Sequence, residues 1–329
     1  MCARFIASRS AVRQAIAGLV NDGWLKSQKG IGTFCVLKDR PLTMDIGLVC
    51  FFSSSYIFPR ISRGCDEVAH RRGFHILLNQ SEYKLDKERE ILAKLQKRGV
   101  DGIIIEPVFD GGGASNVELL AELDRSGIPV VLIDNYFPDR GFTRVAMDDR
   151  AAGRLVAAHL WAKGHRDIGI LCDCGYLPKK LRREGAEGWL AEAGATARAS
   201  WRVSFEGPIH SGGAARALEA FFDSSGPKPT AFIATSDEEA IELYKAAERH
   251  KVKIPDELSV ASFDNSSLAE LPGISLTSVD HPGHYMGELA TQLLLERVLN
   301  PGVASCTDSL VAPRLVERGS VKEIERQGS

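Results

Sequence analysis

The stretch "MDDRAAGRLVAAHLWAKGHRDIGIL", from Met147 to Leu171, holds one unit of the pattern that decides the fold. Residues 148–163 form an expected helix, and a nearly continuous apolar strand, "RDIGILCD", follows it. Apolar strands that alternate with helices are typical of a parallel sheet covered by helices on both faces. The stretch therefore predicts an α/β fold in which this unit recurs.

The same pattern extends along most of the chain, in two sets. The first set has expected strands at "DIGLVCFF", "FHILLNQ", "DGIIIEP" and "IPVVLIDN" and helices near 59–72, 87–98 and 116–126. The second set continues after "RDIGILCD" with "TAFIATSD", "LSVASFDN" and "ISLTSVDH" and helices around 183–193, 213–223, 237–250 and 284–299. Two sets predict two doubly wound parallel-sheet lobes within residues 45–315, with the chain crossing between them near 147 and 265–281. We expect a tail at 316–329.

Polar side chains follow many of these strands. They are Asn79, Gln80, Glu106, Asp134, Asn135, Asp148, Ser236, Asp237, Asp264, Asn265 and His281. Any single one is more readily explained as a helix cap or turn residue, because Asp, Asn and Ser favour those positions. Ligands of open α/β sheets bind outside the carboxyl ends of the strands, so the set also predicts a cleft rich in carboxylates and amides between the lobes.

Such a cleft suits a sugar. Sugar hydroxyls donate to carboxylates and accept from arginine or amide groups, while an aromatic ring covers the apolar face of the sugar. Tyr56, Phe58 and Arg182 are placed to join the polar set. Phosphate or nucleotide binding would call for a glycine-rich loop at a helix start, and neither "GIG" nor "DGGGAS" has that pattern. We expect no cofactor and no metal.

Residues 44 to about 315 resemble the ligand-binding domain of LacI/GalR-type repressors, which is related to type I periplasmic sugar-binding proteins. The resemblance is carried by the opening stretch and by "RREGAEGWLAEAG", "IPDELSVASFDN" and "LTSVDHPGHYMGELATQLLLERV". It implies a ligand cleft. The positions that it assigns to this cleft are Tyr56, Phe58, Arg60, Glu106, Asp148, Arg182, Asp264 and His281. Ser236 stands where the family commonly has Asn. Asp134 is added to the expected ligand contacts because it follows a strand.

A separate basic segment precedes the lobes, at residues 1–38, with a linker at 39–44. In "SRSAVRQAIAGLV", Val12, Ile16 and Leu19 lie on one apolar helical stripe that Ser8 can cap. Two short apolar stretches separated by a basic, glycine-bearing tip follow and predict a hairpin. A helix followed by such a hairpin is typical of the recognition helix and wing of a DNA-binding winged helix.

This segment resembles the GntR-type winged helix, which has further helices before this point. We therefore describe residues 1–38 as a partial winged helix. The residues expected to contact DNA are Arg9, Ser10, Arg13, Gln14, Lys29, Gly30, Gly32 and Thr33. A GntR-type head on a LacI-type body is the architecture of arabinose repressors, and "YIFPRISRGCDEVAHRRGFHILL" and "VDGIIIEP" are also similar to that family.

Charge and composition agree with a regulator in the cytoplasm. Residues 1–40 carry a net charge of +5 and the remainder −7, as expected for a nucleic-acid-binding module joined to an acidic body. No run of about eighteen apolar residues and no export signal is found, so we expect no membrane association. The seven cysteines form no CxxC spacing, and buried reduced thiols are the simplest explanation.

We therefore expect a sugar-responsive regulator that is not an enzyme: a homodimeric repressor whose partners are operator DNA and a monosaccharide, with a pentose such as arabinose as the lead. The alternative is a sugar-binding protein without DNA-binding activity, because the head is partial. A transport protein is disfavoured by the basic hairpin. An enzyme is disfavoured because the chain has no GxSxG, metal triad or P-loop.

Overall fold

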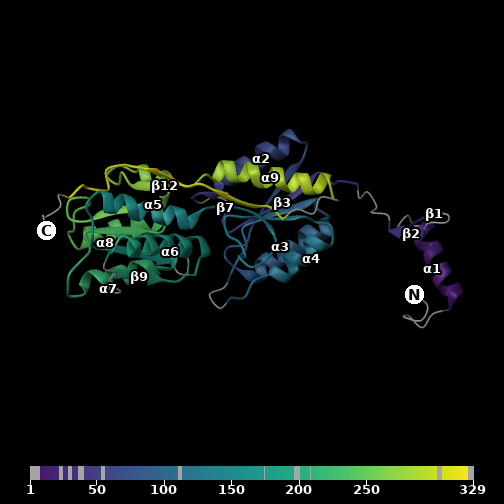
Figure 1. Ribbon diagram of the computed structural model, residues 1–329, viewed down its shortest axis with the longest axis horizontal. Helices are drawn as coiled ribbons and strands as arrows, with labels where there is room; N and C mark the ends of the chain where they lie inside the picture. Colours follow the sequence, from purple (N-terminus) through teal and green to yellow (C-terminus); the bar gives the residue numbers. More distant parts are fainter. Residues whose placement is uncertain are drawn as a thin grey trace. The chain divides into compact units, whose positions relative to one another are not determined.

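The computed structural model describes residues 8–21, 25–28, 32–35, 41–52, 56–109, 113–173, 175–195, 201–207, 209–301 and 306–324. The chain forms two compact units, Met1–Thr43 and Met44–Ser329 (Figure 1). Among the described helices, none has both the length and the apolar character needed to cross a membrane.

The first unit contains a helix followed by a hairpin. Helix α1 (Arg9–Asn21) begins with the expected cap, because the Ala11 amide donates to Ser8 Oγ at 3.1 Å. Strands β1 (Leu25–Gln28) and β2 (Gly32–Cys35) pair antiparallel. The residues expected to contact DNA whose side chains or backbone are described are all exposed: Ser10, Arg13, Gln14, Gly32 and Thr33. Lys29, Gly30 and the side chain of Arg9 lie outside the described residues.

The second unit has two lobes, and the N-lobe comprises residues 44–147 and 283–311. Its six strands are parallel, in the order β13-β7-β6-β5-β3-β4. The strands are β3 (Asp45–Cys50), β4 (His75–Gln80), β5 (Gly102–Ile105), β6 (Val130–Ile133), β7 (Thr143–Met147) and β13 (Asp308–Val311). Helices α2 (Phe58–Arg71) and α9 (Gly283–Leu299) cover one face, and α3 (Leu85–Arg98) and α4 (Val117–Arg125) cover the other (Figure 1).

The C-lobe comprises residues 148–282 and 312–324 and repeats this design. Its sheet has the order β14-β12-β11-β10-β8-β9, parallel except for β14. The strands are β8 (Ile168–Asp173), β9 (Arg202–Phe205), β10 (Ala231–Ala234), β11 (Ser259–Asp264), β12 (Thr277–Asp280) and β14 (Arg314–Val316). Helices α5 (Asp149–Ala162) and α6 (Leu177–Glu192) cover one face, and α7 (Gly213–Asp223) and α8 (Asp237–Arg249) cover the other. Short 3₁₀ helices η2 (Ile209–Ser211) and η3 (Ser267–Glu270) complete it.

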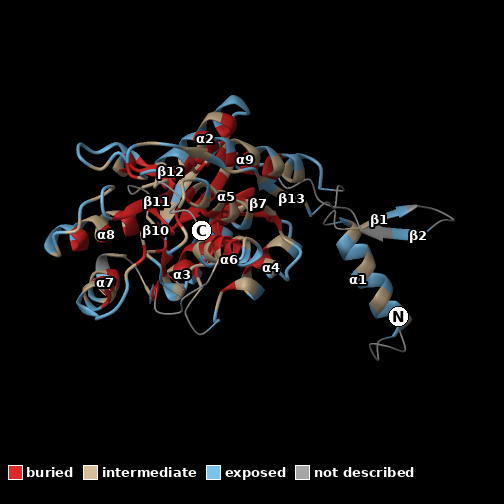
Figure 2. Ribbon diagram, turned by 60° about the vertical axis from the view of Figure 1, so that its left-hand side comes forward, coloured by how far each residue is buried: buried red, intermediate tan, exposed pale blue. Residues whose placement is uncertain are grey.

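The central strands of both lobes are buried between helices whose outer faces are exposed (Figure 2). Strands β5, β6 and β10 are buried at every residue, which explains their continuous apolar sequences. The predicted fold, two doubly wound α/β lobes of the periplasmic-binding type, is confirmed. The sequence pattern did not predict the edge strands β9, β13 and β14, nor the inner strand β7, because each mixes polar or charged residues with apolar ones.

Three short segments connect the lobes. The chain crosses at Asp148, at residues 281–282 and at residues 312–313. The sequence predicted crossings near the first two, while the third connects β13 to β14 and was not predicted. The predicted tail begins too early, because residue 316 still belongs to β14.

The residues after β14 are also packed on the C-lobe sheet. Ser320 is 1% exposed and its Oγ donates to the Val260 carbonyl at 2.6 Å, while the Lys322 amide donates to Ser259 Oγ at 3.0 Å. Residues 317–324 are therefore part of the C-lobe and not a free tail.

Each lobe contains a pair of helices in backbone contact through glycines. In the C-lobe, Gly153 of α5 faces the Arg182 carbonyl, and Gly185 of α6 faces the Arg150 carbonyl. In the N-lobe, Gly64 of α2 and Gly287 of α9 make the equivalent pair. A Cβ at any of the four positions would overlap a backbone carbonyl, so these helices pack this closely only through glycine.

Candidate functional site

A cavity of about 690 Å³ lies between the lobes, at the carboxyl ends of both sets of strands. This is where ligands of doubly wound sheets bind. From the N-lobe the lining comprises Phe51, Phe52, Tyr56, Ile57, Phe58, Tyr83, Glu106, Phe109, Asp134 and Asn135. From the C-lobe it comprises Asp173, Gly175, Tyr176, Lys179, Arg182, Glu206, Gly207, Ile209, Glu238 and Asp264.

Arg182 organises the C-lobe wall. Its Nη1 donates to Asp264 Oδ1 at 2.8 Å and to the Thr235 carbonyl at 2.9 Å, and its Nε donates to Asp149 Oδ1 at 2.7 Å. Burial acts to lower the pKa of Arg182, but the carboxylates of Asp264 and Asp149 outweigh it and raise this pKa well above its ordinary value. The cavity wall therefore carries a fixed guanidinium with two carboxylates around it.

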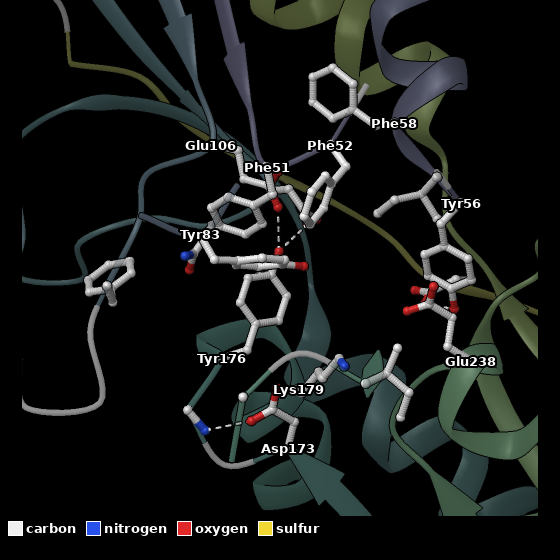
Figure 3. A pocket seen from close by; sticks show the side chains of 18 of the residues that line it. Phe51, Phe52, Tyr56, Phe58, Tyr83, Glu106, Asp173, Tyr176, Lys179 and Glu238 are labelled. Carbon is white, nitrogen blue, oxygen red and sulfur yellow. Dashed lines mark hydrogen bonds between the residues drawn. The ribbon is translucent and has the colours of Figure 1, made fainter. Parts of the chain in front are cut away.

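A tyrosine from each lobe reaches across the cavity and forms hydrogen bonds with the other lobe. Tyr56 of the N-lobe donates to Asp264 Oδ2 of the C-lobe at 2.5 Å and accepts from the Asp237 amide at 2.8 Å. In the opposite direction, the hydroxyl of Tyr176 lies within hydrogen-bond distance of two N-lobe carboxylates, 2.6 Å from Glu106 Oε1 and 2.8 Å from Asp134 Oδ2 (Figure 3). Buried carboxyl groups on both walls thus form hydrogen bonds with hydroxyl groups.

Glu106 and Asp134 differ in protonation. Burial, and then the nearby charge of Asp134, raise the pKa of Glu106 to about 8. Burial opposes ionisation of Asp134 too, but His281, whose Nε2 lies 2.9 Å from Asp134 Oδ1, lowers the pKa of that carboxyl. The pair therefore offers one neutral carboxyl and one carboxylate to a bound ligand.

A second charged group lies on the C-lobe wall near β8. Lys179 Nζ is 2.9 Å from Glu239 Oε1, and its side chain is 14% exposed. Burial acts to lower its pKa, but Glu239 and Asp173 outweigh it and raise the pKa. Aromatic rings lie on the N-lobe wall, where the ring centroids of Phe51 and Tyr83 are 4.1 Å apart.

The backbone is unusual at the cavity. Tyr56, Tyr83, Asp134 and Asp264 have φ values of 71°, 58°, 62° and 98°, in the left-handed region that residues with side chains rarely adopt. Backbone strain of about 1–3 kcal/mol per residue is found mostly where function requires a particular side-chain position. Four of the residues that line the cavity thus have this strained backbone, although Met44, Lys251 and Ser275, which do not line it, have it too.

Of the ten residues predicted to bind ligand, six line the cavity: Tyr56, Phe58, Glu106, Asp134, Arg182 and Asp264. The other four have different positions. Asp148 and His281 lie in two of the lobe crossings, and Arg60 Nη1 is 3.5 Å from Asp280 Oδ1 beside the second crossing. Ser236 caps α8, where its side chain accepts from the Glu239 amide. Asp148 and His281 thus lie in crossings, Arg60 lies on α2 beside one of them, and Ser236 lies at a helix start.

The position of Asp148 gives a testable expectation. Its Oδ1 accepts from the Ala151 amide at 2.9 Å, which is an N-cap of α5. We expect Asp148→Ala to lower the free energy of unfolding by about 0.5–2 kcal/mol in urea titrations, and Asp148→Asn, which still caps, to have little effect. Neither variant should change the affinity of the inter-lobe cavity for its ligand, and a loss of that affinity in Asp148→Asn would place Asp148 in the binding site.

Several lining residues had no signal in the sequence pattern. Phe51 and Phe52 continue the apolar character of β3 and were included in the strand, although β3 ends at Cys50. Tyr176 precedes α6, for which the pattern predicted a start six residues later than the observed Leu177. Tyr83, Lys179 and Glu238 follow no strand directly. An explicit search for aromatic residues just beyond strand ends would have found Phe51 and Phe52.

The described residues contain one group with the geometry to hold a metal ion, and it lies away from the cavity. It consists of Glu67, His284 and Glu288 on α2 and α9. Glu67 is already paired with Arg63 at 2.9 Å and Glu288 with Arg71 at 3.5 Å, so arginines neutralise these carboxylates. The cavity itself offers groups suited to hydroxyl-bearing ligands.

The raised pKa of Glu106 predicts a pH dependence of stability. The carboxyl titrates near its ordinary 4.5 in the unfolded chain and near 8 in the folded one. Between these values the folded state holds a proton that the unfolded state has lost, so this group's contribution makes stability fall as pH rises from about 4.5 to about 8. In urea titrations at several pH values, Glu106→Gln should gain stability relative to the unmodified protein as pH rises. If the difference in the free energy of unfolding between the two proteins is the same at pH 4.5 and at pH 8, the pKa of Glu106 is not raised.

Comparisons with known proteins agree with this geometry. Residues 157–321 match the family model described as a periplasmic binding protein-like domain. An arabinose metabolism transcriptional repressor from Geobacillus stearothermophilus is 30% identical over 338 aligned positions, which cover 98% of this chain and 89% of that protein. An HTH-type transcriptional repressor PurR from Photobacterium profundum is 29% identical over 288 positions, covering 86% of this chain and 82% of that protein.

A solved structure is similar throughout the lobes. It is a LacI family transcriptional regulator from Enterococcus faecium with bound ribose, with a TM-score of 0.73 and 23% identity, covering 85% of this chain and 100% of that chain. At this identity the likeness supports the fold alone.

Proposed function

Because this chain belongs to the LacI family of transcriptional repressors, with the periplasmic-binding-protein-like domain of that family, we propose that it represses transcription in response to a sugar bound between its lobes. The proposal assigns operator DNA to the N-terminal winged helix and a monosaccharide to the cavity. A pentose such as arabinose is the lead, since a relative that covers nearly the whole chain is an arabinose metabolism repressor.

One observation carries the sugar assignment. Asp264 accepts a hydrogen bond from the hydroxyl of Tyr56 across the cavity, and the hydroxyl of Tyr176 lies between Glu106 and Asp134 and donates to one of them. A sugar hydroxyl is the same kind of donor, and Arg182 can donate to a ring or hydroxyl oxygen. The candidate ligand residues are therefore Tyr56, Phe58, Glu106, Asp134, Arg182 and Asp264, with Tyr176 added from the structure.

The proposed mechanism is a change in the lobe arrangement. A ligand that contacts both lobes favours one arrangement, and in a homodimer this changes the spacing of the two winged helices relative to the operator half-sites. A coupling of about 1–3 kcal/mol between the sites corresponds to roughly 5–150-fold control of operator binding. Arg9, Ser10, Arg13, Gln14, Lys29, Gly30, Gly32 and Thr33 are the proposed DNA contacts.

Selection of duplexes from a random library tests the proposal without knowledge of the operator. The selected duplex is then titrated at low salt, with and without L-arabinose, D-xylose or D-ribose. We expect Arg13→Ala to weaken operator binding and a sugar to release the DNA. Binding of sugar without selection of any duplex at low salt would instead support a sugar-binding protein without DNA-binding activity.

A further inference from the structure

The cavity extends across more of the sheets than one sugar ring needs. Its lining runs from β6 to β4 in the N-lobe and from β11 to β9 in the C-lobe. Each interval is three strand spacings, or about 14 Å at about 4.8 Å per spacing. A furanose or pyranose ring is about as wide as a phenyl ring, so one monosaccharide occupies only part of this length.

The volume gives the same result. At about 690 Å³ the cavity lies within the range of roughly 300–1,000 Å³ of pockets that take drug-sized ligands. A single pentose is smaller than such a ligand. Space for a second ring therefore remains after one monosaccharide is bound.

The two halves of the cavity differ in chemistry. In the hinge half, near β6 and β11, the buried groups Asp134, Arg182 and Asp264 are the polar partners described above. In the edge half, near β3, β4, β8 and β9, aromatic rings form the N-lobe wall, and Asp173, Lys179 and Glu206 lie on the C-lobe side. Figure 3 shows Phe51, Tyr83 and Tyr176 gathered in one part of the cavity and Tyr56 with Glu238 in another.

Tyr83 is the central residue of the edge half. Its ring centroid lies 4.1 Å from that of Phe51 and 5.5 Å from that of Phe52, yet the residue is 44% exposed. It also has a φ of 58°, an unfavourable conformation for a bulky residue. An accessible aromatic ring in a cavity that also offers carboxylates and an ammonium can cover the apolar face of a sugar ring and bind its hydroxyls.

We propose that the edge half is a second sugar subsite, so that the preferred effector is a disaccharide or longer saccharide whose second ring stacks on Tyr83. This proposal rests on the proposed function, since it needs the hinge half to hold the first ring. It assigns hydroxyl contacts of the second ring to Asp173, Lys179 and Glu206.

Calorimetric titration of the full chain tests the proposal. The probes are L-arabinose, D-xylose and D-glucose and their disaccharides arabinobiose, xylobiose and cellobiose. One disaccharide should bind more tightly than its own monosaccharide. Tyr83→Ala should weaken the binding of that disaccharide by about tenfold, or about 1.4 kcal/mol, and leave the affinity for the monosaccharide unchanged. Tyr83→Phe keeps the ring and should bind both normally, and Tyr285→Ala removes an exposed tyrosine outside the cavity and should change neither affinity.

The outcomes separate the two proposals. A monosaccharide that binds at least as tightly as every disaccharide overturns the second subsite and leaves the proposed function in place. A disaccharide preference that survives Tyr83→Ala also overturns it, because the second ring then lies elsewhere. Failure of every saccharide to bind overturns both the subsite and the proposed function.

Discussion

Replacing Gly185 by alanine is expected to lower the free energy of unfolding by about 3 kcal/mol or more, enough to deplete the folded protein. The added Cβ would overlap the Arg150 carbonyl of α5, and backbone cannot rotate away as a side chain can. Helices α5 and α6 would have to separate, and Arg182 on α6 would move from its partners Asp149 and Asp264. Urea titration followed by circular dichroism measures the loss.

The same helix provides the control. Gly188 is exposed and nothing lies within 4 Å of a Cβ built there. Gly188→Ala should therefore raise the free energy of unfolding by about 0.5–1 kcal/mol, as alanine does in an exposed helix interior. Equal effects at the two positions would show that helix propensity, and not the contact with α5, determines the result.

Asp264→Asn is expected to weaken the binding of the responding sugar by about 10- to 150-fold, or about 1.5–3 kcal/mol, the range for hydrogen bonds to a charged group. The substitution keeps the shape of the side chain while removing the charge that accepts from Tyr56 and Arg182. Calorimetry measures the affinity. A thermal melt without sugar separates loss of affinity from loss of folding.

Asp280→Asn is the matched control. Asp280 is the register partner of Asp264 on the neighbouring strand, but it does not line the cavity. It pairs with Arg60 at 3.5 Å and Arg314 at 3.7 Å, both of which are exposed, so these ion pairs contribute little. An equal loss of affinity in both variants would indicate that net charge, and not the hydrogen bonds of Asp264, attracts the ligand.

The sequence predicted the fold well because burial on both faces leaves long apolar strands. Strands β5, β6 and β10 and helices such as α5 and α7 lie within a few residues of their predicted positions. Strands β9, β13 and β14 do not have this signal, because they lie at sheet edges and carry exposed polar residues. Strand β4 is also an edge strand, but its apolar residues 76–78 made it predictable. The third crossing was missed for the same reason, as β13 and β14 on either side of it are edge strands.

The candidate site was predicted less completely. Polar residues at strand ends identified Glu106, Asp134 and Asp264, because a carboxylate next to an apolar strand is conspicuous. The same criterion selected Asp148 and Ser236, which cap helices, since a cap and a ligand contact look alike in sequence. Tyr176 reaches the opposite lobe, and no local pattern encodes a contact with Glu106, 70 positions away.

The three crossings also affect how a ligand is captured. They consist of Asp148, residues 281–282 and residues 312–313, so the two lobes are tied together by three very short connections. A sugar that binds one lobe therefore meets the other at an effective concentration in the millimolar range or above, without a second diffusional encounter. Contacts that would be too weak for either lobe alone can thus combine into one selective binding event.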